Sequence, residues 1–167
     1  MSTTAHTLQL IIDQVRPQLL KLDDQQAAQA PAPGKWSPKQ IIGHLIDSAS
    51  NNHQRFMRAQ FTDDLVFQGY QQEEWVELQD YAAADWSNLV QLWYHFNWQI
   101  ARVIANVPDK KRHQLRAKHN LHQIAMYRIP ADQPATLEYF MLDYVKHLEG
   151  HIRQIILDYE AITLERG

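Results

Sequence analysis

The sequence predicts a single all-α domain over residues 1–167, built on four long helices. Four segments carry apolar residues at the 3.6-residue period of a helix, and no segment shows the sustained alternation of a half-buried strand. A chain of 167 residues suits one hydrophobic core. Hydrophobic residues make up 45% of the chain and charged residues 21%, which is typical of globular proteins and argues against a disordered or fibrous chain.

The first helix is expected over residues 4–29. Pro17 lies inside this segment and cannot donate a backbone hydrogen bond to the Asp13 carbonyl, so we expect a kink there. The sequence APAPGKW at 30–36 then ends the helix. Its apolar stripe consists of Leu8, Ile11, Ile12, Val15, Leu19 and Leu22.

The second helix has the clearest start signal. Ser37 is a favourable N-cap, Pro38 suits the first helical position, and Gln40 completes a capping box. We expect the helix to continue to about Gln60. Its predicted buried positions are Ile41, Leu45, Ala49, Phe56 and Met57.

The third and fourth helices follow from similar patterns. Asp85 is a candidate N-cap for the third helix, and Pro108 ends it. The fourth helix is expected from Leu137 to about Ile162, after Thr136. The predicted inner face of the third helix consists of Leu89, Trp93, Phe96, Ile100 and either Val103 or Ile104.

Two long connections, 61–84 and 107–135, flank the third helix. Connections of this length in a compact domain are usually functional or contain short structure of their own. The first is too aromatic for a disordered linker, and we expect it to pack across one end of the helices. The second is more polar, and we interpret both KKRHQLRAKH at 110–119 and HNLH at 119–122 as solvated.

Composition and charge exclude several classes of partner. A formal net charge of −3 does not suggest a nucleic-acid-binding protein. No apolar run approaches the length of a membrane span, and MSTTAHTLQL lacks the basic start and apolar core of a signal peptide. We therefore expect a cytoplasmic protein with no nucleic-acid or membrane partner. The chain contains no cysteine, so any thiol chemistry has to use a thiol brought by the substrate.

Two histidines lie one turn apart in YVKHLEGHIRQI at 144–155. Each helical residue turns by about 100° and rises by about 1.5 Å, so His147 and His151 share one face, which also carries apolar residues. A buried imidazole needs a hydrogen-bond partner or a metal, since an unpaired buried polar group costs about 1–3 kcal/mol. The pair alone is compatible both with hydrogen-bonded core histidines and with metal ligands.

A third histidine, His44, lies near the buried edge of the second helix. One histidine from one helix and a pair from another is an arrangement by which helical bundles build interior metal sites. Three histidine ligands leave a coordination position open, as in catalytic zinc sites. An ion held by three neutral imidazoles is a strong Lewis acid, which lowers the pKa of bound water and deprotonates a coordinating thiol.

Several polar residues lie within reach of this predicted site. Asp47, Ser48 and Asn51 follow His44 on the second helix, and Asp143 precedes His147 by one turn. Ligating histidines usually donate their second N–H to such groups, although solvent exposure is an equally good interpretation of each. A metal-bound water or thiolate is the expected nucleophile, and the candidate catalytic side chains are Asp47, Tyr70 and Asp143.

The aromatic connection 61–84 is also expected to cover the open end of the metal site, because its aromatic residues need apolar contacts and the metal face needs protection from water. Tyr70 is predicted to lie closest to the ion. The five aromatic residues are Phe61, Phe67, Tyr70, Trp75 and Tyr81.

Other catalytic motifs are absent from the sequence. A carboxylate-bridged di-iron bundle needs Glu-x-x-His on two helices, and the chain contains none. His-Glu-x-x-His, a glycine-rich phosphate loop and Gly-x-Ser-x-Gly are absent as well, which argues against zincin proteases, P-loop proteins and α/β-hydrolases.

GKWSPKQIIGHLIDS, followed about a hundred residues later by TLEYFMLDYVKHLEGHIRQI, resembles the marker motifs of the DinB/YfiT-like superfamily of metalloenzymes. The segments YQQEEWVELQDY and LVQLWYHFNWQIARVI are similar to the middle of its members. The resemblance implies a four-helix bundle of up-down-down-up order. It also implies that His44, His147 and His151 bind a divalent metal, zinc or nickel, and that the protein is a homodimer, to which the number of apolar helix positions also points.

The resemblance leaves two functional hypotheses. Characterised relatives are thiol S-transferases that use a low-molecular-weight thiol, and some are metal-dependent hydrolases or isomerases. The first hypothesis is therefore a metal-dependent enzyme acting on a small molecule, either by presenting a thiolate to an electrophile or by hydrolysis. The second is a non-catalytic module that holds a metal or small ligand for stability or sensing.

Overall fold

The computed structural model describes residues 3–163, and within them four long helices form the body of the molecule. Short helices and two isolated β-bridges occupy the connections. The prediction of an all-α protein is confirmed. The long helices are α1 (Thr3–Leu19), α3 (Pro38–Arg58), α5 (Trp86–Asn106) and α8 (Leu137–Ile155). The short ones are α2 (Asp24–Ala27), α4 (Gln72–Leu78), the 3₁₀ helix η1 (Tyr81–Ala83), α6 (Asp109–His113) and α7 (Leu121–Ile124).

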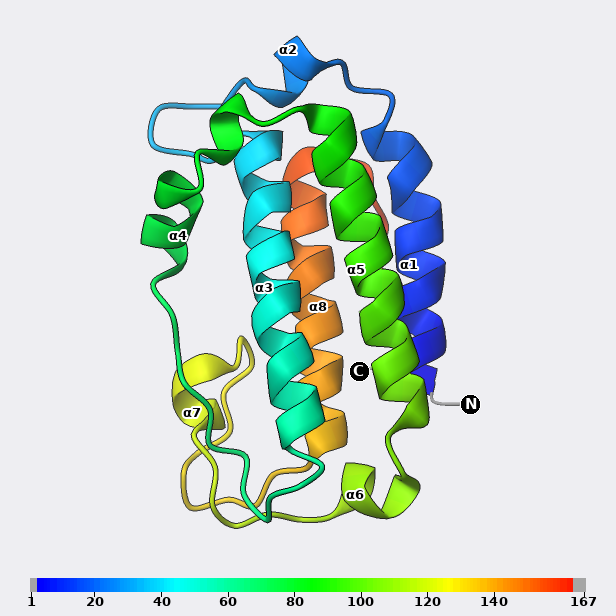
Figure 1. Cartoon of the computed structure of the whole chain (residues 1–167), viewed down its shortest axis with the longest axis vertical. Coiled ribbons are helices and arrows are strands. Elements are labelled where there is room, and N and C mark those ends of the chain that lie inside the picture. The colour runs from blue at the N-terminus through cyan, green and yellow to red at the C-terminus, as the bar shows by residue number, and fades with distance from the viewer. Residues whose placement is uncertain (1–2, 164–167) are drawn as a thin grey trace.

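The four long helices follow the order up, down, down, up (Figure 1). Helix α5 packs against α1 and α3, and α8 packs against the same two helices from the other side. Helices α3 and α5 are therefore parallel neighbours, and the connection between them has to return along the whole length of the bundle. This return path carries α4 and η1 on the outside of α3 (Figure 1).

The first helix is shorter than the sequence pattern suggests. The expected helix over 4–29 is wrong, because α1 ends at Leu19, two residues after Pro17, and a separate helix α2 begins at Asp24. Asp23 caps α2 by accepting a 2.8 Å hydrogen bond from the Gln26 backbone N–H. The Gln26 side chain accepts from the Asp23 backbone N–H in return. This capping box provides a local helix start that interrupts the longer apolar period.

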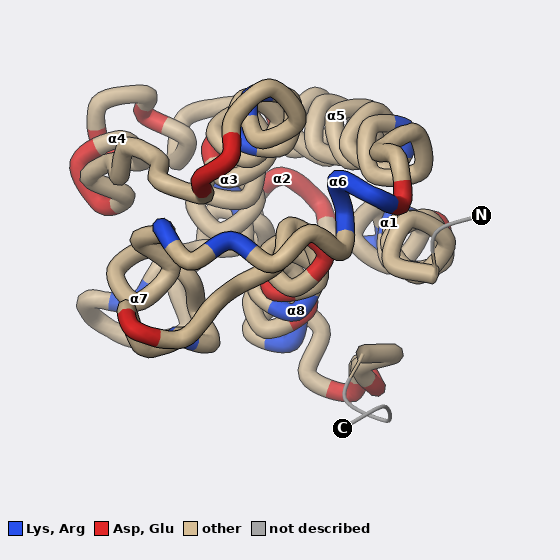
Figure 2. The backbone as a smooth tube through the Cα atoms, turned by 90° about the horizontal axis from the view of Figure 1, so that it is seen from below, with Lys and Arg blue, Asp and Glu red and all other residues tan. Residues whose placement is uncertain are grey.

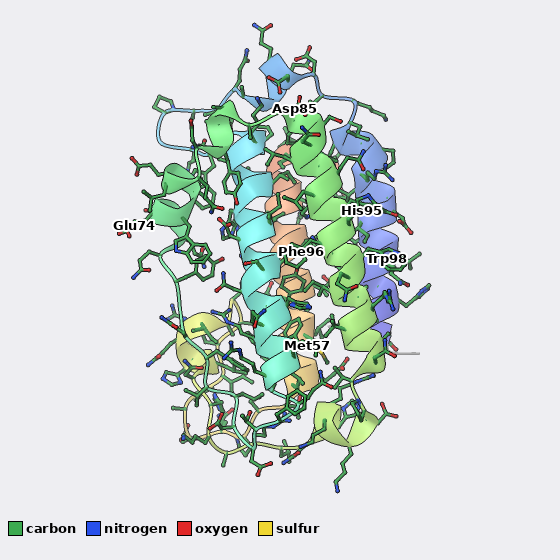
Figure 3. All side chains as sticks on the ribbon, in the orientation of Figure 1. Met57, Glu74, Asp85, His95, Phe96 and Trp98 are labelled. Atoms are coloured by element: carbon green, nitrogen blue, oxygen red, sulfur yellow. The ribbon has the colours of Figure 1, made fainter. Side chains whose placement is uncertain are left out.

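The predicted starts of α3 and α5 are confirmed. Ser37 and Gln40 form the expected capping box, and Asp85, at the upper end of α5 in Figure 3, accepts a hydrogen bond from the Asn88 backbone N–H. Two predicted core residues lie at the surface instead. The side chain of Met57 is 39% exposed, and Phe96 is only half-buried, between α3 and α5 in Figure 3.

Helix α8 ends at Ile155, so its expected continuation to Ile162 is wrong. The chain beyond it folds back onto Glu149, a buried residue of α8. The Glu149 carboxylate accepts hydrogen bonds from the Tyr159 hydroxyl and from the Ile162 backbone N–H, each at 2.7 Å, and from both the backbone and the hydroxyl of Thr163. A buried carboxylate needs such donors, and the fold-back supplies them.

The connection 107–135 is not the solvated linker that its composition suggested. Arg116 is 1% exposed and donates a hydrogen bond to the Ala59 carbonyl at the end of α3, and Arg112 is also buried. His119 is buried as well, with Nε2 at 2.6 Å from the Gln133 carbonyl and Nδ1 accepting from the Leu121 backbone N–H. At this end of the molecule the basic positions of α6 follow one another directly, next to an acidic position at the start of that helix (Figure 2).

The core lies between the long helices and is lined by aliphatic residues of all four. Trp93 is its largest fully buried side chain. None of the helices in the described part of the chain has the length and hydropathy that a membrane span requires.

Candidate metal centre

His44 of α3 meets His147 and His151 of α8 inside the bundle. The two helices run in opposite directions side by side, which brings together residues 103 positions apart in the chain. Nε2 of His44 lies 3.2 Å from Nε2 of His147. One ring nitrogen from each of the three histidines lies within 4.8 Å of the other two. The sequence-predicted cluster is thus present in the structure.

The three rings face one another at steep angles. The ring centroids of His44 and His151 are 4.7 Å apart, and those of His147 and His151 are 4.6 Å apart. The interplanar angles lie between 64° and 74°, so the rings are not stacked face to face. In this arrangement the ring edges, which carry the nitrogens, are directed at a common region.

Burial keeps the cluster uncharged. His44 is fully buried, and burial lowers the pKa of His44 and of His147 to about 3, with the neighbouring histidines contributing in the same direction. Burial also lowers the pKa of His151, against a smaller opposing effect of Gln154. Neutral imidazole is the form that binds metal, so at neutral pH all three side chains are ready to act as ligands.

The donor set fits a divalent ion. Two imidazole nitrogens bound to one zinc ion at about 2.0–2.1 Å lie about 2.8–3.4 Å apart for bond angles between 90° and the tetrahedral value. The observed 3.2 Å between His44 and His147 falls in this range. Core packing alone leaves Nδ1 of His44 and of His151 buried without a hydrogen-bond partner among the described residues. Internal hydrogen bonds therefore do not satisfy the three rings, which favours a further ligand.

Trp36 covers one side of the cluster. Its ring centroid lies 5.1 Å from that of His44 and 6.4 Å from that of His151. Trp36 directly precedes the Ser37 cap, so the same signal that starts α3 positions the indole over the histidines. Trp36 belongs to the motif GKWSPKQIIGHLIDS, but the sequence predicted no role for it in the site. The sequence signal for this role was the position of Trp36 immediately before the Ser37 N-cap of α3.

Asp47 is held by the connection that contains η1. Its Oδ1 accepts hydrogen bonds from the Tyr81 hydroxyl at 2.7 Å and from the Gln79 side chain at 2.8 Å. Burial raises the pKa of Asp47, and these two hydrogen bonds oppose the effect. No hydrogen bond to a histidine is found among the described residues, and Oδ2 has no partner there. Asp47 therefore connects α3 to η1, and its candidate catalytic role stays a prediction.

Asp143 holds the other connection in place. Its two carboxylate oxygens accept hydrogen bonds from the backbone N–H groups of Met126 at 3.0 Å and Tyr127 at 2.7 Å. Burial raises the pKa of Asp143, while these hydrogen bonds and Lys146 lower it. Asp143 thus fixes the segment after α7 one turn away from His147. Its catalytic role also stays a prediction.

A cavity of about 430 Å³ opens beside the histidines. His147 and His151 line it together with other α8 residues, the polar face of α3, residues 123–126, and Tyr70 and Gln72 of the aromatic connection. Burial raises the pKa of Tyr70 to about 12, so its hydroxyl keeps its proton at neutral pH. The connection 61–84 does contribute to the wall, and residues 123–126, which were not predicted to lie at the site, contribute as well.

The expectation that all five aromatic residues of 61–84 need apolar contacts is wrong for Phe61, which is 83% exposed. Tyr81 is buried against α3, and Phe67 stacks on Phe140 with centroids 5.5 Å apart. Tyr70 packs on Trp75, 4.8 Å between centroids, at the cavity. The aromatic residues of this connection therefore have different surroundings and do not form one cover over the histidines.

Comparison with known proteins identifies relatives whose names describe them as metal-dependent hydrolases. YfiT of Bacillus subtilis, named "Putative metal-dependent hydrolase YfiT", is 25% identical over 122 residues, covering 73% of this chain and 63% of YfiT. A protein of Oceanobacillus iheyensis with the same description is 36% identical over 70 residues, covering 39% of this chain and 41% of that protein. The matched regions thus span less than two thirds of the length of either relative.

The solved structure of YfiT shares the fold. It superposes with a TM-score of 0.74 at 21% sequence identity, covering 94% of this chain and 87% of that one, and it is described as having "an unusual four-helix bundle topology". This supports the up-down-down-up bundle seen in Figure 1. The model of the DinB superfamily matches residues 8–155, which include all three histidines of the cluster. The chain therefore belongs to the DinB superfamily.

Proposed function

We propose that His44, His147 and His151 hold a divalent metal ion and that the protein is a metal-dependent enzyme acting on a small molecule. The observation that carries this proposal is the convergence of three neutral imidazoles within 4.8 Å at the edge of a cavity of about 430 Å³. A cavity of this size accommodates a small ligand. Three protein ligands leave room for a substrate or solvent atom at the ion, as catalytic sites require.

The chemistry follows from the ligand set and its surroundings. A divalent ion with three neutral ligands supplies Lewis acidity, which activates water or a thiol as a nucleophile near neutral pH. Trp36 keeps solvent away from the histidines on one side. Tyr70 lines the cavity with its hydroxyl protonated, so it is able to donate a hydrogen bond to a substrate oxygen. Zinc and nickel are the ions we expect, since imidazole is a suitable ligand for both.

Hydrolysis of a small molecule is the first candidate reaction. The relatives described as metal-dependent hydrolases support it. The test begins with metal analysis of the purified protein, followed by a panel of ester, amide and lactone substrates assayed with loaded and chelated protein. Turnover that requires the ion and is lost in His147→Ala supports the proposal. A protein that binds no divalent ion, or whose turnover survives chelation, contradicts it.

Transfer of a low-molecular-weight thiol is the second candidate. The observation that favours it is the absence of cysteine from the chain, because no protein thiol competes with a substrate thiol for the ion. Loss of free thiol in the presence of a model electrophile, measured with loaded and chelated protein, distinguishes this reaction from hydrolysis. Stoichiometric metal without turnover in either assay supports the non-catalytic hypothesis instead.

A further inference from the structure

Arg55 is a buried cation that forms no ion pair with a carboxylate among the residues that the structure describes. Its side chain is 7% exposed, and its Nη2 donates a 2.7 Å hydrogen bond to the Gln68 carbonyl. Its Nη1 lies 3.5 Å from the Asn52 side-chain oxygen. Both partners are neutral. The ion pairs found among the described residues involve other basic side chains, those of Lys39, Arg112 and Lys118.

Burying a charge without a counter-charge is unfavourable, so an arginine in this position calls for an explanation. The described residues that line the cavity do not provide the missing negative charge. Asp143 is the one acidic side chain among the described residues that line the cavity, and both of its oxygens are occupied by the backbone N–H groups of residues 126 and 127. Arg55 is the one Lys or Arg side chain in the same lining.

The surroundings of Arg55 are suited to an anion. Ser48, Asn52 and Tyr70 line the cavity on the same side, and all three carry neutral hydrogen-bonding groups. The guanidinium has five N–H donors, of which the described contacts use two. The remaining donors match the two oxygens of a carboxylate, which arginine binds in a bidentate manner. One positive charge balances one carboxylate, whereas a phosphate dianion would leave a charge unpaired.

We propose that Arg55 binds a carboxylate of the substrate, at the opposite end of the cavity from the histidine cluster. This inference rests on the proposed metal site and names the substrate class: an elongated small molecule with a metal-directed group at one end and a carboxylate at the other. The guanidinium lies at the level of Asn52, eight residues along α3 from His44. At about 1.5 Å per residue, the two ends of the ligand are on the order of 10 Å apart.

The test uses a ligand series that separates the two ends. The protein is loaded with Ni²⁺ and titrated with ω-mercapto carboxylic acids of increasing chain length, and with ω-mercapto alcohols and ω-mercapto amines of the same lengths. The thiolate-to-nickel charge-transfer band reports binding at the ion. Short acids and alcohols should bind equally well. At the chain length that reaches Arg55 the acid should bind about 10- to 100-fold more tightly than the alcohol, as expected for a hydrogen bond to a charged group, and the amine most weakly.

Arg55→Gln should reduce this preference to about one at every chain length, while Arg58→Gln, an exposed arginine one turn further along α3, should leave it unchanged. Arg55→Lys, which keeps the charge, should retain part of the preference. Equal affinities of acid and alcohol at all lengths in the unaltered protein overturn the inference without reference to any variant. A preference that persists in Arg55→Gln overturns it as well.

The outcomes distinguish this inference from the proposed function. If the protein retains no Ni²⁺ after loading, the metal site itself is absent and the inference falls with it. If the loaded protein gives no charge-transfer band with any probe, no thiolate reaches the ion and the two-ended ligand is wrong. If every probe produces the band but the acids show no advantage, the metal site stands and only the role of Arg55 is wrong.

Discussion

The ring of Tyr81 packs directly on the backbone of Gly43, the residue before His44. A Cβ atom added to Gly43 would lie 2.2 Å from two atoms of that ring. The Tyr81 hydroxyl also binds Asp47, one turn further along α3. The connection containing η1 is therefore attached to α3 at two points that flank a predicted metal ligand.

Gly43→Ala should destabilise the protein. Alanine is favoured over glycine in a helix by about 1 kcal/mol, but the overlap with Tyr81 forces a displacement that costs about 1–3 kcal/mol or more. Thermal unfolding should show a lower melting temperature. Gly150→Ala is the matched control, because its Cβ would meet only the end of the Met126 side chain at 3.5 Å, an ordinary contact. Equal melting temperatures for the two variants would contradict the prediction.

Replacing His44, His147 or His151 with alanine should abolish stoichiometric binding of zinc or nickel, because two imidazoles do not replace the three-ligand site. Metal analysis after gel filtration measures the effect. His95→Ala, an exposed position on α5 (Figure 3), should retain the full amount of metal. The ion should also raise the melting temperature of the unaltered protein, since it binds only the folded state, and a chelator should reverse the shift.

The stability of the metal-free protein should fall as the pH drops below about 6.5. Folding lowers the pKa of His44 and His147 to about 3, whereas an unfolded histidine has a pKa near 6.5, so the unfolded state binds more protons between these values. This contribution is complete above about pH 6.5 and is lost progressively towards pH 3. Urea unfolding across this range measures it, with the His147→Ala protein, which lacks one of these groups, expected to show a smaller slope.

Metal affinity should resist mild acid. From the sequence alone, the affinity for the metal would be expected to fall as the pH drops through about 6.5, the ordinary pKa of histidine. Because burial lowers the pKa of the ligands, protons should compete poorly with the ion in the folded protein. Calorimetric titrations at about pH 7.5 and about pH 5.5 should therefore give similar dissociation constants. A tenfold or greater weakening at the lower pH would show that the histidines titrate normally.

Asp143→Ala should loosen the segment after α7. The change removes the acceptor for the Met126 and Tyr127 backbone N–H groups. A hydrogen bond to a charged acceptor contributes about 1.5–3 kcal/mol to stability. Hydrogen exchange of these two amides should become faster. Asp158→Ala, at an exposed position, is the control and should leave their exchange unchanged. Unaltered exchange in Asp143→Ala would mean that other contacts hold the cavity wall.

We predict that the protein is a homodimer in solution. Leu92 and Trp98 of α5 expose 52% and 42% of their surface, and Trp98 lies on the outward side of that helix (Figure 3). Light scattering at micromolar concentration should give twice the chain mass. Trp98→Glu should weaken the association more than Leu78→Glu on α4, which is 83% exposed. A monomeric mass for the unaltered protein would remove the prediction.

The sequence predicts the long helices well where local signals and apolar periodicity agree. The Ser37–Gln40 capping box and the Asp85 cap are both formed. The predicted ends of helices α1 and α8 were wrong, because the apolar pattern continues beyond each helix into residues that are buried in non-helical segments or in a separate helix. Ile162, for example, follows the end of α8 and donates its backbone N–H to Glu149. Periodicity detects burial and does not by itself distinguish a helix from a segment that folds back.

The histidine cluster was accessible from the sequence because the spacing of His147 and His151 is a helical property. Its surroundings depend on contacts across the chain. His119 looked solvated because its neighbours are polar, yet the Gln133 carbonyl lies 2.6 Å from its ring. Arg55 offered no local signal, since its closest hydrogen-bond partner, the Gln68 carbonyl, belongs to the connection that returns along α3. Residues whose environment is provided by distant segments escape a local interpretation.

The up-down-down-up order also determines when the site can exist. Its ligands come from the second and the last of the long helices, and His44 and His147 are 103 positions apart in the chain. No local hairpin brings them together, so the site forms only after the final helix has docked beside α3. Contacts between such distant positions form slowly, because a large chain closure has to precede them. Uptake of the ion during refolding should therefore follow the appearance of helical structure, so that the metal reports completed folding.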